Sequence, residues 1–355
     1  MKKFRFIIIL CLCSLFLVGN VQKRVIDDVN IATGFGIEKS DGQLYGSIMI
    51  PVFKADKSIG NFTFTAKGKI PRDLVSEMQK TASQPIVGGS LDVAFFGEDL
   101  AREGIIQVLD VFLRDPTIGA RLNLAVVDGK VDEIFKGNYG DRGNHEYLRQ
   151  LLEQNMKVHN LPLTNLHFFL ADFYEEGKDA YLPMLKKTKN DLVSIIGIAL
   201  FKDEKLVDIL HENKMFYFKL LVDKHTQGSV MVKEKHGDAS VKSISSKHKI
   251  KILNRNPYKF GVHLKIKGFL TEHQGGNLKK SEVEDLEKQL EKQIVEECTT
   301  MIEDFQRKEI DPVGFGRIAQ TRTRNFDFKK WQEKYKSAQF NITADVEIVQ
   351  IGVIK

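Results

Sequence analysis

A long amphipathic helix constrains this sequence more than any other feature. Between residues 281 and 308, apolar residues recur every three or four positions, and the remaining positions are mostly charged. The apolar positions are Val283, Leu286, Leu290, Ile294, Cys298, Ile302 and Phe305. Ser281 and Glu284 predict a capping box at its start. Because the polar side mixes Glu with Lys and the stripe is not a strict heptad, we expect it to pack into a protein core, not onto a membrane or a coiled-coil partner.

Helical and strand-like patterns are mixed along the rest of the chain. One helix is expected to begin at Pro71, and a second is expected to run from Gly97 to Arg114 without a break. Two further helices are expected at 145–156 and 164–174. Strands are expected at 30–37, 43–53, 91–96, 122–127, 131–135, 193–201, 206–210, 216–222 and 340–348. Asp128-Gly129 suits a tight hairpin turn. Because there is no regular βαβ alternation, the pattern predicts an α+β fold with mixed β-sheets flanked by helices.

The length of 355 residues suits a multi-domain protein with two to three domains. We predict a signal peptide or N-terminal anchor over 1–20 and an N-terminal α/β domain over 21–190. A strand-rich C-terminal region over 191–355 follows and contains the helix at 281–308. Within this region, 191–225 and 226–355 are candidate subdomains.

The N-terminus has the layout of a secretory signal. A basic start, Met1 to Arg5, precedes an uncharged run from Phe6 to Val18, which is shorter than the roughly 20 residues that span a bilayer. Asn20 stands where a lipoprotein signal needs its lipid-accepting cysteine, so we predict no lipid at this position. Cleavage of the signal and its retention as an uncleaved anchor both remain open.

Composition and cysteine usage exclude several classes of protein. The net charge of +6 is modest for this length, and no run of Lys and Arg resembles a nucleic-acid arm, so no nucleic acid partner is expected. Cys11 and Cys13 lie in the N-terminal apolar run, which leaves Cys298 alone in the body of the chain. A single cysteine can form no intramolecular disulfide, and its place on the apolar helix face predicts a small core residue.

Catalytic and cofactor signatures are weak. Gly34-Phe35-Gly36 lies in an expected strand and lacks the third glycine of a dinucleotide site. His145-Glu146 has no second histidine four residues after the first, which a zinc helix requires. The sequence has no GxSxG elbow, Walker loop or EF-hand loop. We therefore expect no enzyme, no catalytic residues, no cofactor and no metal.

Three ordered segments form the most specific pattern in the chain. They are Gly97 to Ile105 with Asp110, Arg114-Asp115 and Arg121; Ile196 to Lys202 with Lys205-Leu206-Val207; and Asp311 to Gly316 with Trp331 and the last strand before Gly352. Together they resemble the Ger(x)C family, the C subunits of spore germinant receptors, over nearly the whole mature chain. Members of that family carry a lipid-accepting cysteine followed by Trp-Asp, whereas this chain has Asn20-Val21-Gln22.

The resemblance implies a non-enzymatic, exported, three-domain α/β protein. It would lie at the outer face of the spore inner membrane and act with membrane A and B subunits in nutrient-triggered germination. An exported small-molecule (nutrient) binding protein that acts independently, with its ligand in an interdomain cleft, is the alternative. Affinity of the isolated protein for amino acids or sugars would favour that alternative.

Two groups of charged residues are candidate interface positions. Asp110 and Arg114 are four residues apart and can pair on one helix face, and Arg121 follows them within the same family segment. Lys247, Lys249 and Lys251 alternate with apolar residues, which places them on one face of a strand. That face is either solvated or turned toward anionic headgroups of the membrane surface or acidic loops of a membrane partner.

Overall fold

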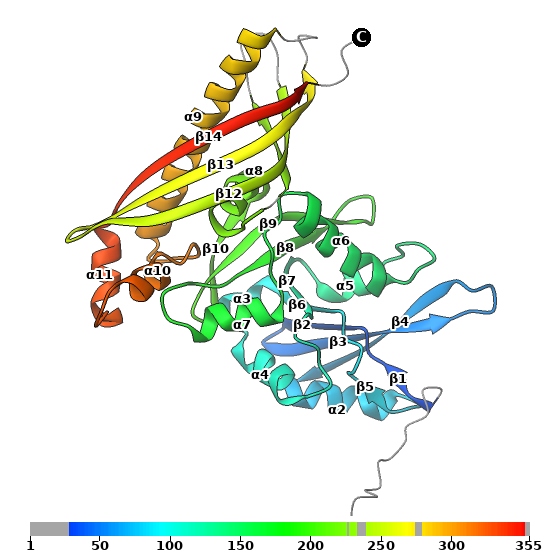
Figure 1. Ribbon diagram of the computed structural model, residues 1–355. Helices are drawn as coiled ribbons and strands as arrows, with labels where there is room; N and C mark the ends of the chain where they lie inside the picture. Colours follow the sequence, from blue (N-terminus) through cyan, green and yellow to red (C-terminus); the bar gives the residue numbers. More distant parts are fainter. Residues whose placement is uncertain (1–27, 226, 233–238, 274–278, 352–355) are drawn as a thin grey trace, which may run out of the picture.

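The computed structural model describes residues 28–225, 227–232, 239–273 and 279–351. The predictions for the signal and for Asn20 lie outside the described residues. The described strands form sheets of two, eight and four strands. Helices flank the two large sheets (Figure 1), which confirms the predicted α+β class with mixed β-sheets.

The eight-stranded sheet has the order β10-β9-β8-β7-β6-β2-β3-β4. Its strands are β2 (Gly34–Ser40), β3 (Gln43–Phe53), β4 (Ile59–Gly68), β6 (Val93–Gly97), β7 (Asn123–Asp128), β8 (Tyr181–Lys187), β9 (Val193–Lys202) and β10 (Lys205–His211). The four central strands, β2, β6, β7 and β8, are parallel to one another. The strand pairs on both sides of them are antiparallel. A small parallel pair, β1 (Asn30–Ile31) and β5 (Ile86–Val87), lies beside it.

Alternate side chains of the central strands supply two separate cores. In β6, Val93 and Phe95 belong to one core, and Ala94 and Phe96 belong to the other. The second core is covered by α2 (Pro71–Thr81), α3 (Glu98–Glu103), α4 (Ile106–Arg114) and α7 (Leu166–Tyr174). The first core takes in α5 (Val131–Phe135), α6 (Asn144–Val158) and α8 (Glu212–Val222), and it continues into the C-terminal layer.

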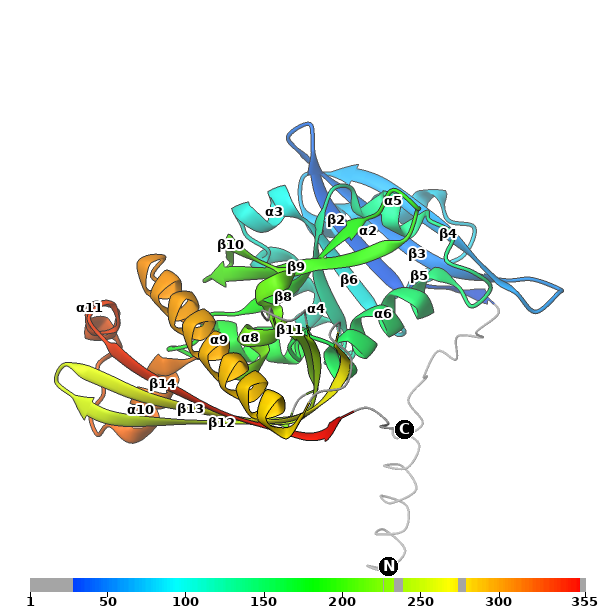
Figure 2. The same cartoon turned by 90° about the horizontal axis from the view of Figure 1, so that it is seen from above.

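That layer is a four-stranded sheet with α9 packed on one face (Figures 1 and 2). The sheet contains β11 (Gly228–Val232), β12 (Ala239–Arg255), β13 (Tyr258–His273) and β14 (Gln339–Ile351), and α9 spans Lys280–Arg307. Glu291 and Glu287 of α9 accept the backbone N–H groups of Val346 and Ile348 in the edge strand β14, at 2.9 and 2.7 Å. The helix therefore protects a sheet edge whose N–H groups would otherwise be free to pair with another chain.

Short helices follow α9 before the last strand. They are α10 (Phe315–Arg322), a 3₁₀ turn η2 (Phe328–Lys330) and α11 (Trp331–Lys336). The predicted helix over 281–308 is confirmed as α9, with ends one residue earlier. At its start Glu282 accepts the backbone N–H of Lys279, so the predicted capping box of Ser281 and Glu284 is wrong.

Two predicted strands are helices. Residues 131–135 form α5, because Val131, Ile134 and Phe135 are buried at helical spacing, and Gly129 with φ +116° turns the chain out of β7 instead of closing a hairpin. Residues 216–222 belong to α8, in which every residue from Met215 to Leu221 is buried. A helix buried on all sides has no polar face, so its sequence looks like that of a buried strand.

Two further predictions differ in detail. The helix expected from Gly97 to Arg114 is broken by Gly104 with φ +133°, which separates α3 from α4. The strand β4 was not predicted at all. The division at residues 190 and 191 stays a prediction, although β9 and β10 follow it in sequence and pair within the eight-stranded sheet.

No helix within the described ranges is long and apolar enough to cross a membrane. The core that joins the sheets runs from Met49 in β3 to Val346 in β14. Because one continuous core serves both layers, separating them would expose apolar surface on each.

We therefore expect the polypeptide from residue 24 to Lys355 to fold alone and to unfold as one cooperative unit. Trp331, the single tryptophan, reports the C-terminal layer, while far-ultraviolet circular dichroism reports the whole chain. Urea titrations followed by both signals should give the same midpoint. A fluorescence midpoint distinct from the dichroism midpoint would show that the two layers unfold separately.

Candidate functional site

A buried carboxylate organises the chain between α9 and α10. Asp311, 5% exposed, accepts the N–H groups of Gly314 and Phe315 on Oδ1 at 2.8 and 3.0 Å, and that of Gly316 on Oδ2 at 2.7 Å. Gly314 has φ +86°, a conformation that favours glycine. The carboxylate therefore satisfies N–H groups at the start of α10 that have no partner within the helix.

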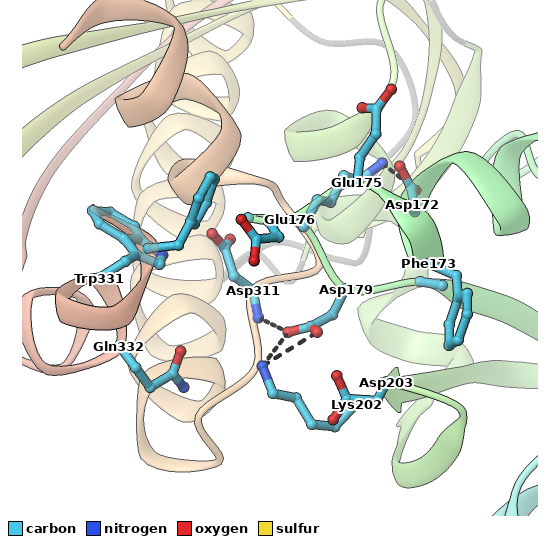
Figure 3. A pocket seen from close by; sticks show the side chains of 14 residues that line it. Asp172, Phe173, Glu175, Glu176, Asp179, Lys202, Asp203, Asp311, Trp331 and Gln332 are labelled. Atoms are coloured by element: carbon cyan, nitrogen blue, oxygen red, sulfur yellow. Dashed lines mark hydrogen bonds and ion pairs between the residues drawn. The ribbon is translucent and has the colours of Figure 1, made fainter. Parts of the chain in front are cut away.

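Asp179 joins this loop to the eight-stranded sheet. It precedes β8, and its N–H donates to the carbonyl of Asp311 at 3.0 Å. In return, Asp179 Oδ2 accepts the N–H of Asp311 at 2.6 Å, and both Asp179 oxygens lie 3.3 Å from Lys202 Nζ (Figure 3). Two segments 132 residues apart are thus fastened by reciprocal hydrogen bonds and an ion pair.

A second set of charges surrounds the same contact. Asp172 at the end of α7 pairs with Lys178 Nζ at 2.7 Å and with Arg317 Nη1 at 3.0 Å, and Arg317 Nη2 reaches Glu175 at 3.1 Å. The backbone also meets there, because the N–H of Arg317 donates to the carbonyl of Gly177 at 2.8 Å.

Glycines make this close approach possible. A Cβ on Gly177, which has φ +89°, would lie 2.6 Å from the backbone N of Arg317. A Cβ on Gly316 would lie 2.8 Å from Gly177 Cα and 2.6 Å from Trp331 Nε1. Any side chain at either position would force the two segments apart.

The electrostatics of this junction are those of a tightly buried acid pair. Burial raises the pKa of Asp311 to about 7, because the loss of solvent outweighs the stabilisation by its N–H donors. Burial also raises the pKa of Asp179, and Lys202 opposes that rise. The adjoining cavity measures about 240 Å³, and Trp331 and Gln332 close it from the C-terminal side (Figure 3).

The junction is arranged to hold segments together, and its principal acids are already paired. Within the described part of the chain, no group of three His, Cys, Asp or Glu side chains could hold a metal ion. The Cys298 thiol is fully buried, and burial raises its pKa far above the usual range, so it is a core residue and not a nucleophile.

The three family segments meet around the turn between β9 and β10. The N–H of Ile105, next to Gly104, donates to the carbonyl of Glu204 in that turn at 3.1 Å. Lys202 at the end of β9 pairs with Asp179, which in turn binds Asp311. Segments that are more than 200 residues apart in the sequence are therefore connected through one hairpin turn.

The candidate interface residues lie outside the junction, on separate elements. Asp110 and Arg114 pair on α4 at 2.6 Å and are exposed. Arg121 is exposed and lines a separate cavity of about 410 Å³ together with Asp223. The predicted lysine face is found on β12, where Lys247, Lys249 and Lys251 are exposed.

Comparisons with known proteins agree over the whole chain. Residues 22–187 match the family described as "Spore germination protein N-terminal domain", and residues 196–352 match "Spore germination B3/ GerAC like, C-terminal". The chain is 32% identical over 354 residues to "Spore germination protein GerQC" of Bacillus cereus, covering 98% of each chain. This chain belongs to the GerAC-like, or Ger(x)C, family of spore germination proteins.

Two further matches support this assignment. "Putative spore germination protein YfkR" of Bacillus subtilis (strain 168) is 23% identical over 382 residues, covering 100% of this chain and 98% of that protein. The fold is that of "Crystal Structure of the GerBC protein", with a TM-score of 0.61 and 21% identity over 90% of this chain and 98% of that one. In this Ger(x)C protein, the family segments supply part of the junction, namely Lys202, Asp311 and Gly316.

Sequence reasoning missed most of the junction. Asp311, Gly314 and Gly316 lay in a segment used for the resemblance, but Asp172, Asp179 and Arg317 carried no signal. Glu175, which is exposed and pairs with Arg317, carried no signal either. The roles of Asp172 and Asp179 depend on contacts with Arg317 and Asp311, which lie 132 or more residues later in the sequence.

We expect Asp311→Asn to destabilise this Ger(x)C protein by about 1–3 kcal/mol, the usual cost of leaving a buried polar group unsatisfied. The asparagine NH₂ would face at least one of the three backbone N–H donors now bound by the carboxylate. Urea unfolding followed by Trp331 fluorescence measures the change. Asp327→Asn, which alters an exposed carboxylate with one backbone N–H partner, is the control and should change stability by less than about 1 kcal/mol. Equal effects of the two substitutions would contradict the role of Asp311.

Proposed function

We propose that this Ger(x)C protein is the non-enzymatic C subunit of a spore germinant receptor and acts with membrane A and B subunits in nutrient-triggered germination. The match over the full length to proteins named for spore germination is the observation that carries the proposal. The junction supports it, because its charges hold the fold together and leave no nucleophile and base facing a substrate.

The alternative of an independent nutrient-binding protein is not favoured. Its expected ligand site was an interdomain cleft. The cavity at the junction is small, about 240 Å³, and most of the carboxylates around it are engaged by Lys178, Lys202, Arg317 or backbone N–H groups. Small-molecule sites usually have about 300–1,000 Å³ and a few convergent polar groups, so the junction cavity does not have the properties of the expected nutrient site.

The outer face of the four-stranded sheet is the surface we assign to a receptor partner. Lys247 stands opposite Lys265 of β13, and Lys249 stands opposite His263. Lys267 and His263 pair with Glu347 and Asp345 of β14. Lys247, Lys249 and Lys251 make no ion pair with any residue that the structure describes, so this face carries uncompensated positive charge.

The position of this face favours a protein over a lipid surface as its partner. The described chain begins beside β1, at the end of the molecule remote from the four-stranded sheet (Figures 1 and 2). Only the residues between Val18 and Asp28 separate that end from the apolar N-terminal run, and they span at most about 35 Å when extended. An N-terminal membrane attachment would thus draw the β1 end toward the bilayer, and acidic loops of an A or B subunit are the partner we propose for the lysines.

Changing Lys247, Lys249 and Lys251 together to Gln should weaken binding to membranes that contain the A and B subunits. Each exposed charge pair contributes about 0.2–1 kcal/mol, so three amount to about 1–3 kcal/mol. Co-sedimentation at increasing salt measures the loss, and the wild-type affinity should fall more steeply with salt than that of the variant.

Two controls make the result specific. The triple change to Arg keeps the charge and should keep binding, and changing Lys288 and Lys292 on the solvent side of α9 to Gln should have no effect. Protein-free vesicles of the same lipids identify any contribution of anionic headgroups. If the triple Gln variant binds receptor membranes as tightly as the wild type does, the lysine face is only a solvated surface.

We place the protein at the outer face of the spore inner membrane, exported through its N-terminal signal. Membrane association follows from its place in a receptor family, and export follows from the basic and apolar N-terminal layout. Because position 20 is Asn, attachment would depend on receptor subunits, or on the N-terminal run if it is retained, and not on a diacylglyceryl group at that position.

The protein from a sporulating host should therefore incorporate no labelled fatty acid, whereas Asn20→Cys should gain label. Asparagine has no thiol to alkylate, and the substitution restores the missing acceptor after Leu17-Val18-Gly19. Metabolic labelling followed by immunoprecipitation compares the two. Label on the unaltered protein would contradict the prediction and point to Cys11 or Cys13.

A further inference from the structure

A third cavity lies at the carboxyl ends of the parallel strands. It measures about 350 Å³ and lies at the ends of β2, β6 and β7. It is lined by Glu38, Lys39, Ser40, Gly97, Glu98, Asp99, Asp128, Gly129 and Lys130. After β2 the chain builds β3 and β4 on one side, then crosses to build β6, β7 and β8 on the other. Open α/β sheets bind ligands at such a reversal of strand order.

Glu38 is the buried polar group of this cavity. The residue is 7% exposed, and its Oε2 accepts the backbone N–H of Val131 at the start of α5. Its Oε1 has no hydrogen-bond donor among the residues that the structure describes. Because Glu38 lines the cavity and its Oε2 is bound to Val131, Oε1 is the carboxylate oxygen left for a ligand.

The backbone holds Glu38 in place. A Cβ on Gly97, its neighbour on β6, would lie 2.7 Å from Glu38 Cβ, so only glycine allows the two strands to bring Glu38 to this position. Gly97 begins the first of the three family segments. The close approach gives that glycine a role beyond starting α3, because it places a carboxylate at the cavity wall.

Most charged side chains of the cavity wall are engaged by other side chains. Arg102 pairs with Glu98 at 2.6 Å, and Lys186 pairs with Asp128 at 2.6 Å. The two lysines of the wall are also paired, Lys39 with Glu103 and Lys130 with Glu133. Asp99 alone among the other acids of the wall has no ion pair or hydrogen bond to a described residue. The cavity thus has a net acceptor character, with Glu38 Oε1 and Asp99 as its free oxygens.

We propose that this cavity binds a cationic group with several N–H donors, an alkylammonium or a guanidinium, through Glu38 Oε1 and Asp99. A carboxylate removed from water needs a partner, and burial here raises the pKa of Glu38 despite its bond to Val131. A donor-rich cation supplies both the charge and the hydrogen bonds. It can come from a free amine or from a Lys or Arg side chain of a receptor subunit, and the two sources share this chemistry.

The free-cation source is tested on the full-length protein in detergent. With ¹³C-labelled glutamate, the carboxyl resonance of Glu38 is identified by its absence in Glu38→Gln, whose amide oxygen can still accept from Val131. Methylguanidinium chloride should shift the Glu38 resonance saturably. Tetramethylammonium chloride at equal concentration has the same charge but no N–H donor, and it should not. Asp99→Asn, an exposed change on the same wall, should weaken the affinity by about tenfold.

The partner source is tested by co-sedimentation with membranes that contain the A and B subunits. Glu38→Gln should reduce binding about tenfold, and Glu77→Gln, an exposed acid on α2 outside the cavity, should leave it unchanged. Saturable methylguanidinium binding supports a free-cation site, and loss of membrane binding without it supports a partner side chain. The proposal is overturned if the wild-type protein shows no saturable methylguanidinium shift and a folded Glu38→Gln protein binds the receptor membranes as tightly as the wild type does. The resonance measurement does not involve receptor subunits, so its failure is distinct from failure of the receptor assignment.

Discussion

The contact between Asp179 and Asp311 is the constraint on which the arrangement of the molecule depends. Each residue binds the backbone of the other, and Asp311 also organises the start of α10. Two neighbouring buried carboxylates repel each other, and Asp179 contributes to the raised pKa of Asp311. Here Lys202 offsets the charge of Asp179, and backbone N–H groups offset that of Asp311. These partners outweigh the repulsion between the two carboxylates only when the junction is complete. The contact is consequently specific: it forms when β8, β9 and the segment after α9 are all in place.

This dependence explains why the family segments are so far apart in the sequence. Gly97 and Gly104 fix the approach of α3 to β2 and to the turn between β9 and β10, and Gly316 fixes the approach of α10 to Gly177. Each glycine stands where a side chain would strike a backbone or a neighbouring side chain. Together the segments hold α3, the turn between β9 and β10 and the loop before α10 against the eight-stranded sheet. The glycines and acids of these segments therefore have structural roles, and they form no catalytic motif.

Elements with one polar and one apolar side could be predicted from the sequence. Contacts between residues far apart in the sequence could not. The stripe of α9 and the lysine alternation on β12 were predicted because one side of each element faces water. Helix α8 was taken for a strand because it is buried on every side, and α5 because five residues provide little periodicity. Asp172, Asp179 and Arg317 could not be found from spacing, since Asp311 and Arg317 lie more than 130 residues after Asp179 and Asp172. Glu38 gave no signal either, because its burial depends on Gly97 and α5.

A shared core and a polar junction together decide how such a protein can respond to its neighbours. Domain interfaces that are small and polar permit hinge motion, whereas a large apolar interface suppresses it. In this molecule the apolar core continues from β3 to β14, and the junction adds directional bonds at its margin. The β1 end and the lysine face lie at opposite ends of this body. The continuous core and the directional bonds at its margin therefore both oppose hinge motion between the two large sheets.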